Sequence, residues 1–224
     1  MTDDNAVRIA TARCADYDLE TVRGALARVL EPLGGMSAYV GKGERVLVKP
    51  NFLLAATADK AITTHPTVIR AVVEAVREAG AGHILVGDSP AFHSGRAAAR
   101  KLRLGEVLDG LDVEIVDLDG STAVDNPTGV VYRRLELSRH VLEAERVINV
   151  CKLKSQGQMA MTLAIKNCFG AVVGTRKAAW HMEAGRDAML FARMLVDVAR
   201  RVNPSLSICD GVVAMEGNGP SAGT

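Results

Sequence analysis

The chain of 224 residues has 27 basic and 26 acidic residues, and only 4% of its residues are aromatic. This balance argues against a general attraction to nucleic acid or to an anionic membrane, because either needs a marked basic excess. The acidic N-terminus does not resemble a secretory signal, and no apolar run approaches the ~20 residues of a membrane span. We therefore expect a cytoplasmic protein with neither a membrane nor a nucleic-acid partner.

Short β-branched runs alternate with helical patterns along the chain, which is typical of βαβ units. The runs predict strands at 6–13, 45–51, 83–89, 113–119, 130–137, 146–153 and 206–212. Those that begin at 45, 83, 146 and 206 are almost continuously apolar, as in central strands that are covered on both faces. The run at 130–137 alternates more and predicts an edge strand.

Helical spacing is clearest at 66–81, where Pro66 fits a first turn and Gly80 an end. Weaker patterns predict helices at 18–33, 94–109, 158–169 and 182–201. The alternation predicts an α/β fold with a mostly parallel open sheet, helices on both faces and room for an antiparallel edge strand. No linker divides residues 1–224, so we expect a single α/β domain.

Polar side chains follow the predicted strands where ligands of open parallel sheets usually bind, at the carboxyl ends. These residues are Lys49, Asn51, Asp88, Ser89, Lys152, Lys154 and Asp210. Polar residues also begin wherever a strand ends, but groups of both signs after four strands favour a shared cleft. Thr64 and His65 add a predicted helix N-terminus, whose amides favour an anion unless the residues act only as a cap.

Gln158, Thr162 and Lys166 fall four residues apart and predict one polar line on an otherwise apolar helix. A lysine in apolar surroundings is less readily charged unless an anion compensates it, which suits substrate anchoring or proton transfer. The alternative is a cation near a helix C-terminus, followed by a simple stop at Asn167. His181 lies in a basic segment further on.

The stretch "DGVVAMEGNGP" ends the last predicted strand at Asp210. Its glycines would let Glu216 and Asn218 turn back over the cleft, although a merely flexible turn would have the same composition. The cysteines are widely spaced and predict reduced core thiols rather than a metal site. They are Cys14, Cys151, Cys168 and Cys209.

Five segments together resemble the domain of unknown function 362 family: "VLVKPNFL", "TTHPTVIRAVVEAVREAGAGHILVGDSP", "RVINVCKLKS", "MTLAIKNCFGAVVGTRKAAWH" and "CDGVVAMEGNGPSAG". The resemblance implies a prokaryotic protein, whose longer relatives often carry a ferredoxin-like module with four-iron four-sulfur clusters. They also continue past the "MEGNGP" turn, so the chain resembles the N-terminal portion of a longer protein. Family members commonly have Lys-Thr-His where this chain has Lys154-Ser155-Gln156, which leaves His181 or His65 to replace that histidine.

These observations favour an enzyme, or half of one, that binds a small anionic metabolite at the carboxyl ends of the strands. Lys166, His181, Asp210 and Glu216 would be the catalytic groups. The substrate-binding residues would be Lys49, Asn51, Thr64, His65, Asp88, Ser89, Lys152, Lys154, Asn167 and Asn218.

The reaction is open between redox chemistry, as in an iron–sulfur-associated oxidoreductase, and a proton-transfer isomerisation. We expect no cofactor or metal within the chain, with any iron–sulfur cluster held elsewhere in the full-length protein. The alternative is a non-catalytic module that binds a ligand or docks a ferredoxin-like electron-transfer partner. Oligomerisation is left open.

Overall fold

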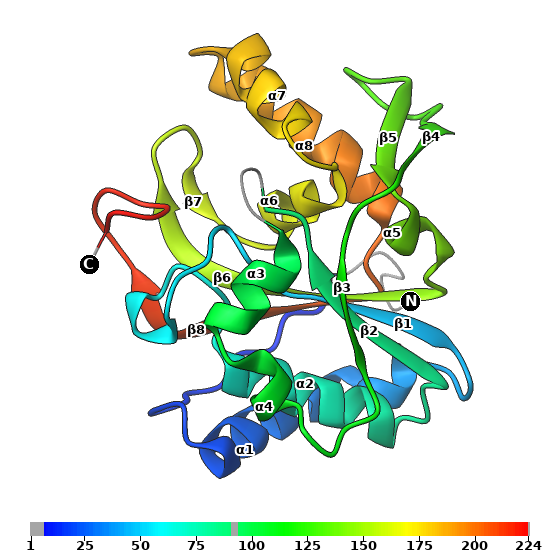
Figure 1. The fold of residues 1–224 in the computed structure, drawn as a ribbon, viewed down its shortest axis with the longest axis vertical. Helices are drawn as coiled ribbons and strands as arrows, with labels where there is room; N and C mark the ends of the chain where they lie inside the picture. The colour runs from blue at the N-terminus through cyan, green and yellow to red at the C-terminus, as the bar shows by residue number, and fades with distance from the viewer. Residues whose placement is uncertain (1–6, 91–93, 224) are drawn as a thin grey trace, which may run out of the picture.

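The computed structural model describes residues 7–90 and 94–223, and its centre is a sheet of five parallel strands (Figure 1). Their spatial order is β3-β2-β1-β6-β8. They are β1 (Arg45–Lys49), β2 (His83–Asp88), β3 (Glu114–Asp117), β6 (Arg146–Gln156) and β8 (Leu206–Met215). The chain builds outward from β1 in one direction and returns to β6 on its other side, so β1 and β6 flank the topological switch point.

An antiparallel strand, β7 (Ala160–Thr162), pairs with the distal end of β6 through the register Lys154↔Thr162. The edge strand left open by the sequence is therefore present. It lies where a helix at 158–169 was expected, and that expectation is wrong: β6 continues to Gln156, a turn follows, and the helix α6 (Ala164–Cys168) has five residues. The hydrogen bonds between β6 and β7 determine the structure of this segment, although its polar residues are spaced as on one face of a helix.

One face of the sheet is covered by α1 (Leu19–Leu30), α2 (Pro66–Glu78), α3 (Gly95–Lys101) and α4 (Leu104–Val107). The helices predicted at 66–81 and 18–33 are confirmed, the latter ending in the short 3-10 helix η1 (Glu31–Leu33). The helix predicted at 94–109 is interrupted at Arg103, whose φ of 53° is left-handed. Two more 3-10 turns on this side are η2 (Met36–Ala38) and η3 (Ala58–Lys60).

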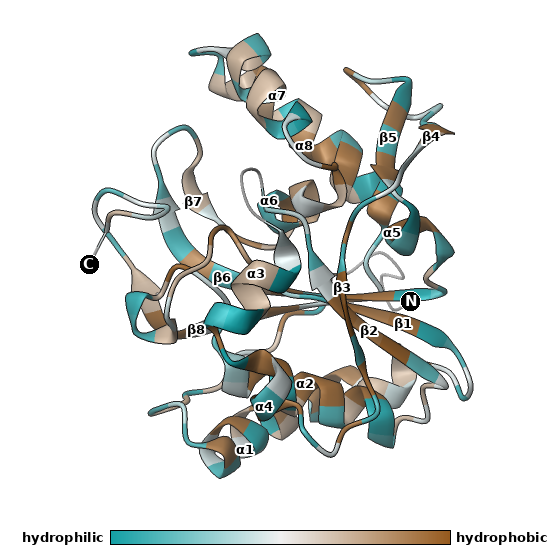
Figure 2. Ribbon diagram, viewed as in Figure 1, coloured by the Kyte–Doolittle hydropathy of each residue, from teal (hydrophilic) through white to brown (hydrophobic). Residues whose placement is uncertain are grey.

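The opposite face packs against α5 (Arg139–Glu143), α6, η4 (Phe169–Ala171), α7 (Arg176–Ala184) and α8 (Ala188–Val202). The helix predicted at 182–201 is divided at Gly185, whose φ is 55°. Figure 2 shows the apolar stretches of β1 and β2 between these two helical layers. The predicted α/β fold, with a mostly parallel sheet flanked by helices on both faces, is confirmed. No helix in the described part of the chain is long and apolar enough to cross a membrane.

Three strand predictions need correction. Residues 7–13 form no strand, because no other described segment pairs with them in a ladder, and Val7 and Ile9 are exposed. Residue 6 lies outside the described residues. β8 is an edge strand that pairs with β6 alone among the described strands, so it is not central.

The segment at 130–137 contributes only its second half, as β5 (Arg134–Ser138). It pairs with β4 (Ser121–Asp125) in a separate sheet, not at the edge of the main one. The physical reason lies in α8, where the Asp197 carboxylate accepts hydrogen bonds from the backbone N–H groups of residues 130–132 at 2.7–2.9 Å. Those groups cannot join a strand ladder.

Candidate functional site

A buried ion pair joins the ends of β1 and β2. Lys49 Nζ lies 2.7 Å from Asp88 Oδ1, and the side chains are 0% and 5% exposed. The other carboxylate oxygen accepts the backbone N–H of Phe52 at 2.8 Å. Gly170 passes so close that a Cβ there would lie 2.0 Å from Asp88 Oδ1. The pair therefore helps to build the edge of the sheet, and its lysine already has a counter-ion.

A chain of amide groups crosses the switch point between β1 and β6. Lys154 Nζ donates to Asn51 Oδ1 at 2.7 Å, and Asn51 Nδ2 donates to Asn167 Oδ1 at 2.9 Å. Asn167 in turn donates to Asn149 Oδ1 at 2.7 Å. The structure thus brings together three of the predicted binding residues. Asn149 was missed, since inside an apolar strand it looks like an isolated polar residue.

A second buried pair lies between β6 and β8, where Lys152 Nζ is 2.9 Å from Asp210 Oδ2. Lys152 also donates to the hydroxyl of Tyr17 at 2.7 Å, and that hydroxyl donates to Asp210 Oδ1 at 2.9 Å. The ring of Tyr17 stacks on His65 with 3.7 Å between centroids. Tyr17 was missed because it lies just before the first predicted helix and far from the strand ends in the sequence.

The N-terminus of α2, where an external anion was expected, is met by a carboxylate of the chain itself. The backbone N–H of His65 donates to Asp210 Oδ2 at 2.9 Å, and His65 Nδ1 accepts the N–H of Thr67 as a cap. Thr64 Oγ1 donates to the carbonyl of Val150 at 2.8 Å and accepts from Asn51 N–H at 2.9 Å. Thr64 and His65 thus make internal contacts.

Three lysines near this edge form no ion pair with a carboxylate in the described part of the chain, and two of them, Lys154 and Lys166, belong to the predicted site. Burial lowers the pKa of Lys154 to about 7, an effect that nearby Asp88 opposes and Lys166 reinforces. Burial also lowers the pKa of Lys166 to about 8. The Lys166 amine lies 5.0 Å and 5.2 Å from the ring centroids of Phe169 and Phe191. These lysines therefore lack the compensation that Lys49 and Lys152 have.

His181 of α7 lies in this aromatic surrounding, with its ring 4.4 Å from that of Phe191. Gln158 Nε2 donates to the carbonyl of Gly185 at 3.0 Å, which directs Gln158 Oε1 toward His181 Nδ1 at 2.6 Å. The acceptor requires a proton on Nδ1, so Nε2 keeps its lone pair. Burial, and then the charge of Lys166, lower the pKa of His181 to about 4. The imidazole is therefore neutral at pH 7, and it takes up a proton more readily where a nearby anion compensates the charge of Lys166.

Lys177, also on α7, belongs to the basic segment that could surround an anion or form a solvated face, but it was not chosen as a site residue. Its side chain reaches back to β2, where Nζ lies 3.3 Å from Ser89 Oγ, and it also contacts the carbonyl of Val172. Burial lowers the pKa of Lys177 to about 8. The basic segment "GTRK" was the only sequence signal for it.

Glu216 and Asn218 are exposed and do not reach over the lysines. Their turn packs instead against the end of β6, where Ser155 Oγ donates to the carbonyl of Gly217 at 3.0 Å. The proposed polar line is also not a helical face, because Thr162 belongs to β7 and Gln158 to the preceding turn. Gln158 and Lys166 both still act on His181, because Gln158 contacts its Nδ1 and the charge of Lys166 lowers its pKa.

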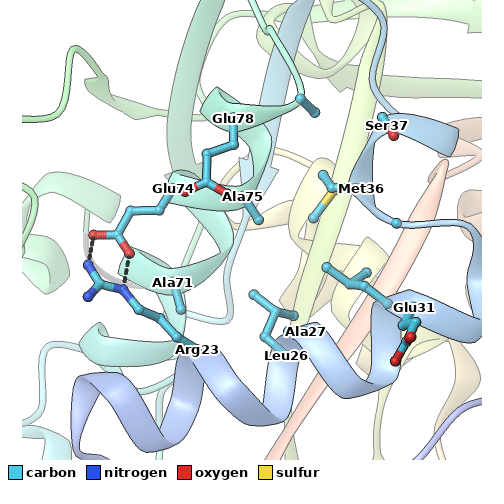
Figure 3. A pocket seen from close by; sticks show the side chains of 13 residues that line it. Arg23, Leu26, Ala27, Glu31, Met36, Ser37, Ala71, Glu74, Ala75 and Glu78 are labelled. Carbon is cyan, nitrogen blue, oxygen red and sulfur yellow. Dashed lines mark hydrogen bonds and ion pairs between the residues drawn. The ribbon is translucent and has the colours of Figure 1, made fainter.

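The described residues contain no group of three or more His, Cys, Asp or Glu side chains that could hold a metal ion. All four cysteines are free thiols, but Cys209 is exposed and Cys14 only partly buried, so the expectation of core thiols holds for Cys151 and Cys168 alone. A cavity of about 490 Å³ lies between α1 and α2, beside the Arg23–Glu74 ion pair (Figure 3). None of the site lysines lines it.

Residues 46–224 match the family described as Domain of unknown function (DUF362). The chain belongs to this family. The DUF362 chain is 44% identical over 216 residues to the Thylakoid-associated protein sll1697 of Synechocystis sp. (strain ATCC 27184 / PCC 6803 / Kazusa), covering 96% of the chain and 66% of that relative. Every site residue from Lys49 onward lies in the matched range, whereas Tyr17 precedes it.

One solved structure supports the fold. The DUF362 chain resembles the lactate racemase apoprotein from Thermoanaerobacterium thermosaccharolyticum, with a TM-score of 0.57, 11% identity, and coverage of 93% of the chain and 52% of that structure. A protein from Thermotoga maritima gives a TM-score of 0.46 at 11% identity, with 89% and 50% covered. The chain thus spans about two thirds of the curated relative and about half of these structures.

Proposed function

We propose that this DUF362 chain binds a small anionic metabolite at the carboxyl edge of its sheet and transfers a proton on it. Lys166 supplies the positive charge next to the ligand, buried Lys154 adds to that charge from a greater distance, and His181 acts as the base. The observation that carries the proposal is the Lys166 amine, which lies among the rings of Phe169 and Phe191 beside a neutral histidine. An anion is the partner that this arrangement lacks.

Electrostatic linkage gives the reason for an anionic ligand. Burial lowers the pKa of Lys154 and of Lys166, and a nearby anion would raise both pKa values again. Binding would therefore take up protons near pH 8, and affinity would fall as the pH rises through the lysine pKa values. Neutral ligands would produce neither effect.

The alternative of an electron-transfer docking module is less well supported. Lysines that dock a partner must reach its surface, but Lys49, Lys152 and Lys154 are at most 1% exposed. A redox reaction would still need an iron–sulfur module from outside the described residues. The thylakoid association in the relative's name concerns that protein, and a cytoplasmic location for this chain stays a prediction.

Ligand-induced thermal stabilisation tests the binding. Phosphate, acetate, oxalate and pyruvate would each be titrated against the wild-type chain, Lys166→Met and Lys60→Met, the last at an exposed lysine. We expect at least one anion to raise the melting temperature, since a ligand at 100 times its Kd adds about 2.7 kcal/mol. Lys166→Met should weaken that effect at least tenfold, and Lys60→Met should not. Equal affinities in all three, or no binding by any probe, would sink the proposal.

Proton transfer needs a separate measurement. Pyruvate has acidic methyl hydrogens, so base catalysis by His181 would exchange them for deuterium in deuterium oxide, as followed by proton NMR. His181→Gln should retain pyruvate binding and lose most of the exchange. Exchange at the wild-type rate in this variant would remove His181 from the mechanism while leaving the binding site intact.

A further inference from the structure

Lys177 is a buried lysine that the proposed anion site does not use. Its side chain is 7% exposed and spans from α7 to the end of β2, where Nζ lies 3.3 Å from Ser89 Oγ. A lysine in solvent interacts only weakly with neighbouring groups, so its burial beside Ser89 sets Lys177 apart from the surface lysines. A buried amine beside a hydroxyl is the arrangement in which lysine serves as a base for a nucleophile.

Ser89 is placed where a nucleophile would be accessible. It follows β2 directly, is partly exposed, and lines a cavity of about 480 Å³ together with Ser94, Asp117 and Thr175. The backbone N–H of Gly174 donates to Ser89 Oγ at 3.3 Å and fixes the oxygen from the side of α7. Gly174 and Thr175 both line the cavity, which places the positive end of α7 next to it.

We propose that Ser89 and Lys177 form a nucleophile–base pair that transfers the acyl group of a small ester. Ser89 Oγ attacks the ester carbonyl carbon while its proton moves to the neutral Lys177 amine. The tetrahedral intermediate then breaks the bond to the leaving oxygen, which takes that proton and departs as an alcohol. Water removes the acyl group from Ser89 in the second half, with Lys177 again accepting and returning the proton.

The surroundings of the pair define the substrate class. Asp117 and Asp119 line the cavity, so their charge disfavours an anionic acyl group and favours a neutral one. This differs from the anion proposed beside Lys166. The charged groups around Lys177 are Asp88, which raises its pKa, and Lys49 and Lys166, which lower it. Together with burial they leave part of the amine neutral near pH 8, as a base requires.

Covalent labelling tests the pair without knowledge of the natural ester. Phenylmethylsulfonyl fluoride would react at Ser89, forming an oxygen–sulfur bond and releasing fluoride, and peptide mass spectrometry would locate the adduct. We expect Ser89→Ala to abolish labelling and Lys177→Met to slow it at least tenfold. Ser94→Ala, on the same cavity, should label at the wild-type rate. The wild-type rate should rise with pH as Lys177 loses its proton.

Lys177→Arg is a control for misfolding of Lys177→Met. It keeps a long cationic side chain but cannot accept a proton near neutral pH. Melting temperatures would show that each variant is folded, and p-nitrophenyl acetate would test for a burst of p-nitrophenol. Slow labelling and no burst in a folded Lys177→Arg support the pair. An unlabelled Ser89 in the wild-type chain, or labelling of the folded Lys177 variants at the wild-type rate, would overturn it.

Discussion

Lys152 and Lys154 stand two residues apart on β6, yet their surroundings differ in one decisive respect. Lys152 faces the Asp210 carboxylate at 2.9 Å, whereas Lys154 donates to the amide oxygen of Asn51 and to the carbonyl of Ile62. The same contrast separates Lys49, which has Asp88, from Lys166, which has only aromatic rings. We infer that a buried lysine with a counter-ion maintains the fold, whereas a lysine without one is the better candidate for contact with a ligand.

The contrast also explains how a folded protein can tolerate several buried lysines, because each kind of lysine limits the cost of burying a charge in a different way. Removing one member of a buried ion pair leaves the other charge unpaired, which costs far more than the pair contributes in net stability. A buried lysine with neutral partners reduces its own cost by losing its proton. Substitution should therefore destabilise the chain more at a paired lysine than at an unpaired one, and the unpaired lysines should make stability depend on pH between about 7 and the pKa of an unfolded lysine.

The largest effect is expected from Lys49→Met, which leaves Asp88 buried without its partner. We predict a loss of about 3–5 kcal/mol in the free energy of unfolding, measured by urea denaturation. Lys154→Met is the matched control, since it removes a buried cation that has no carboxylate and should cost less than about 1.5 kcal/mol. Similar losses in both variants would mean that counter-ions do not distinguish the two lysines.

Much of this edge could be predicted from the sequence, because apolar runs end where the sheet ends. Lys49, Asp88, Lys152 and Asp210 all follow such runs and do lie at the carboxyl edge. The pairing among them could not be predicted. It depends on strand order, which places β2 beside β1 and β8 beside β6, and no local pattern encodes that order.

The failures have local causes. The spacing of Gln158 and Thr162 matched a helix, but the strand β6 extends further and its hairpin takes up those residues. Tyr17 and Lys177 reach the edge from segments outside the sheet, so the rule that ligands gather at strand ends overlooked them. Each contact joins residues more than 80 positions apart.

The pH dependence of the free energy of unfolding should also distinguish the two kinds of lysine, with an effect smaller than that of Lys49→Met. An unfolded lysine has a pKa near ~10.4, whereas that of folded Lys154 is about 7. Between these values the unfolded chain binds more protons, so stability must rise with pH, by up to about 1.4 kcal/mol per pH unit for one such lysine.

Urea denaturation between pH 7 and about pH 8.5 would measure this slope. Lys154→Met should flatten it by roughly 1 kcal/mol per pH unit, and Lys60→Met, at the exposed lysine, should leave it unchanged. A wild-type slope that persists in Lys154→Met would assign the proton release to Lys166 or Lys177, whose pKa values of about 8 act in the same direction.

The smallest effect is expected at Glu216, which the sequence placed over the cleft and the structure places in solvent. Because its carboxylate forms no ion pair within the described residues, Glu216→Gln should change the free energy of unfolding by less than ~0.5 kcal/mol and leave anion affinity unaltered. Asp210→Asn, six residues earlier on β8, should instead destabilise the chain, because Lys152 then loses its counter-ion. Anion binding by Glu216→Gln would be measured by the same thermal titration. A marked loss of binding would show that this exposed carboxylate acts at the site. The presence or absence of a counter-ion at the sheet edge would then not distinguish functional from structural residues.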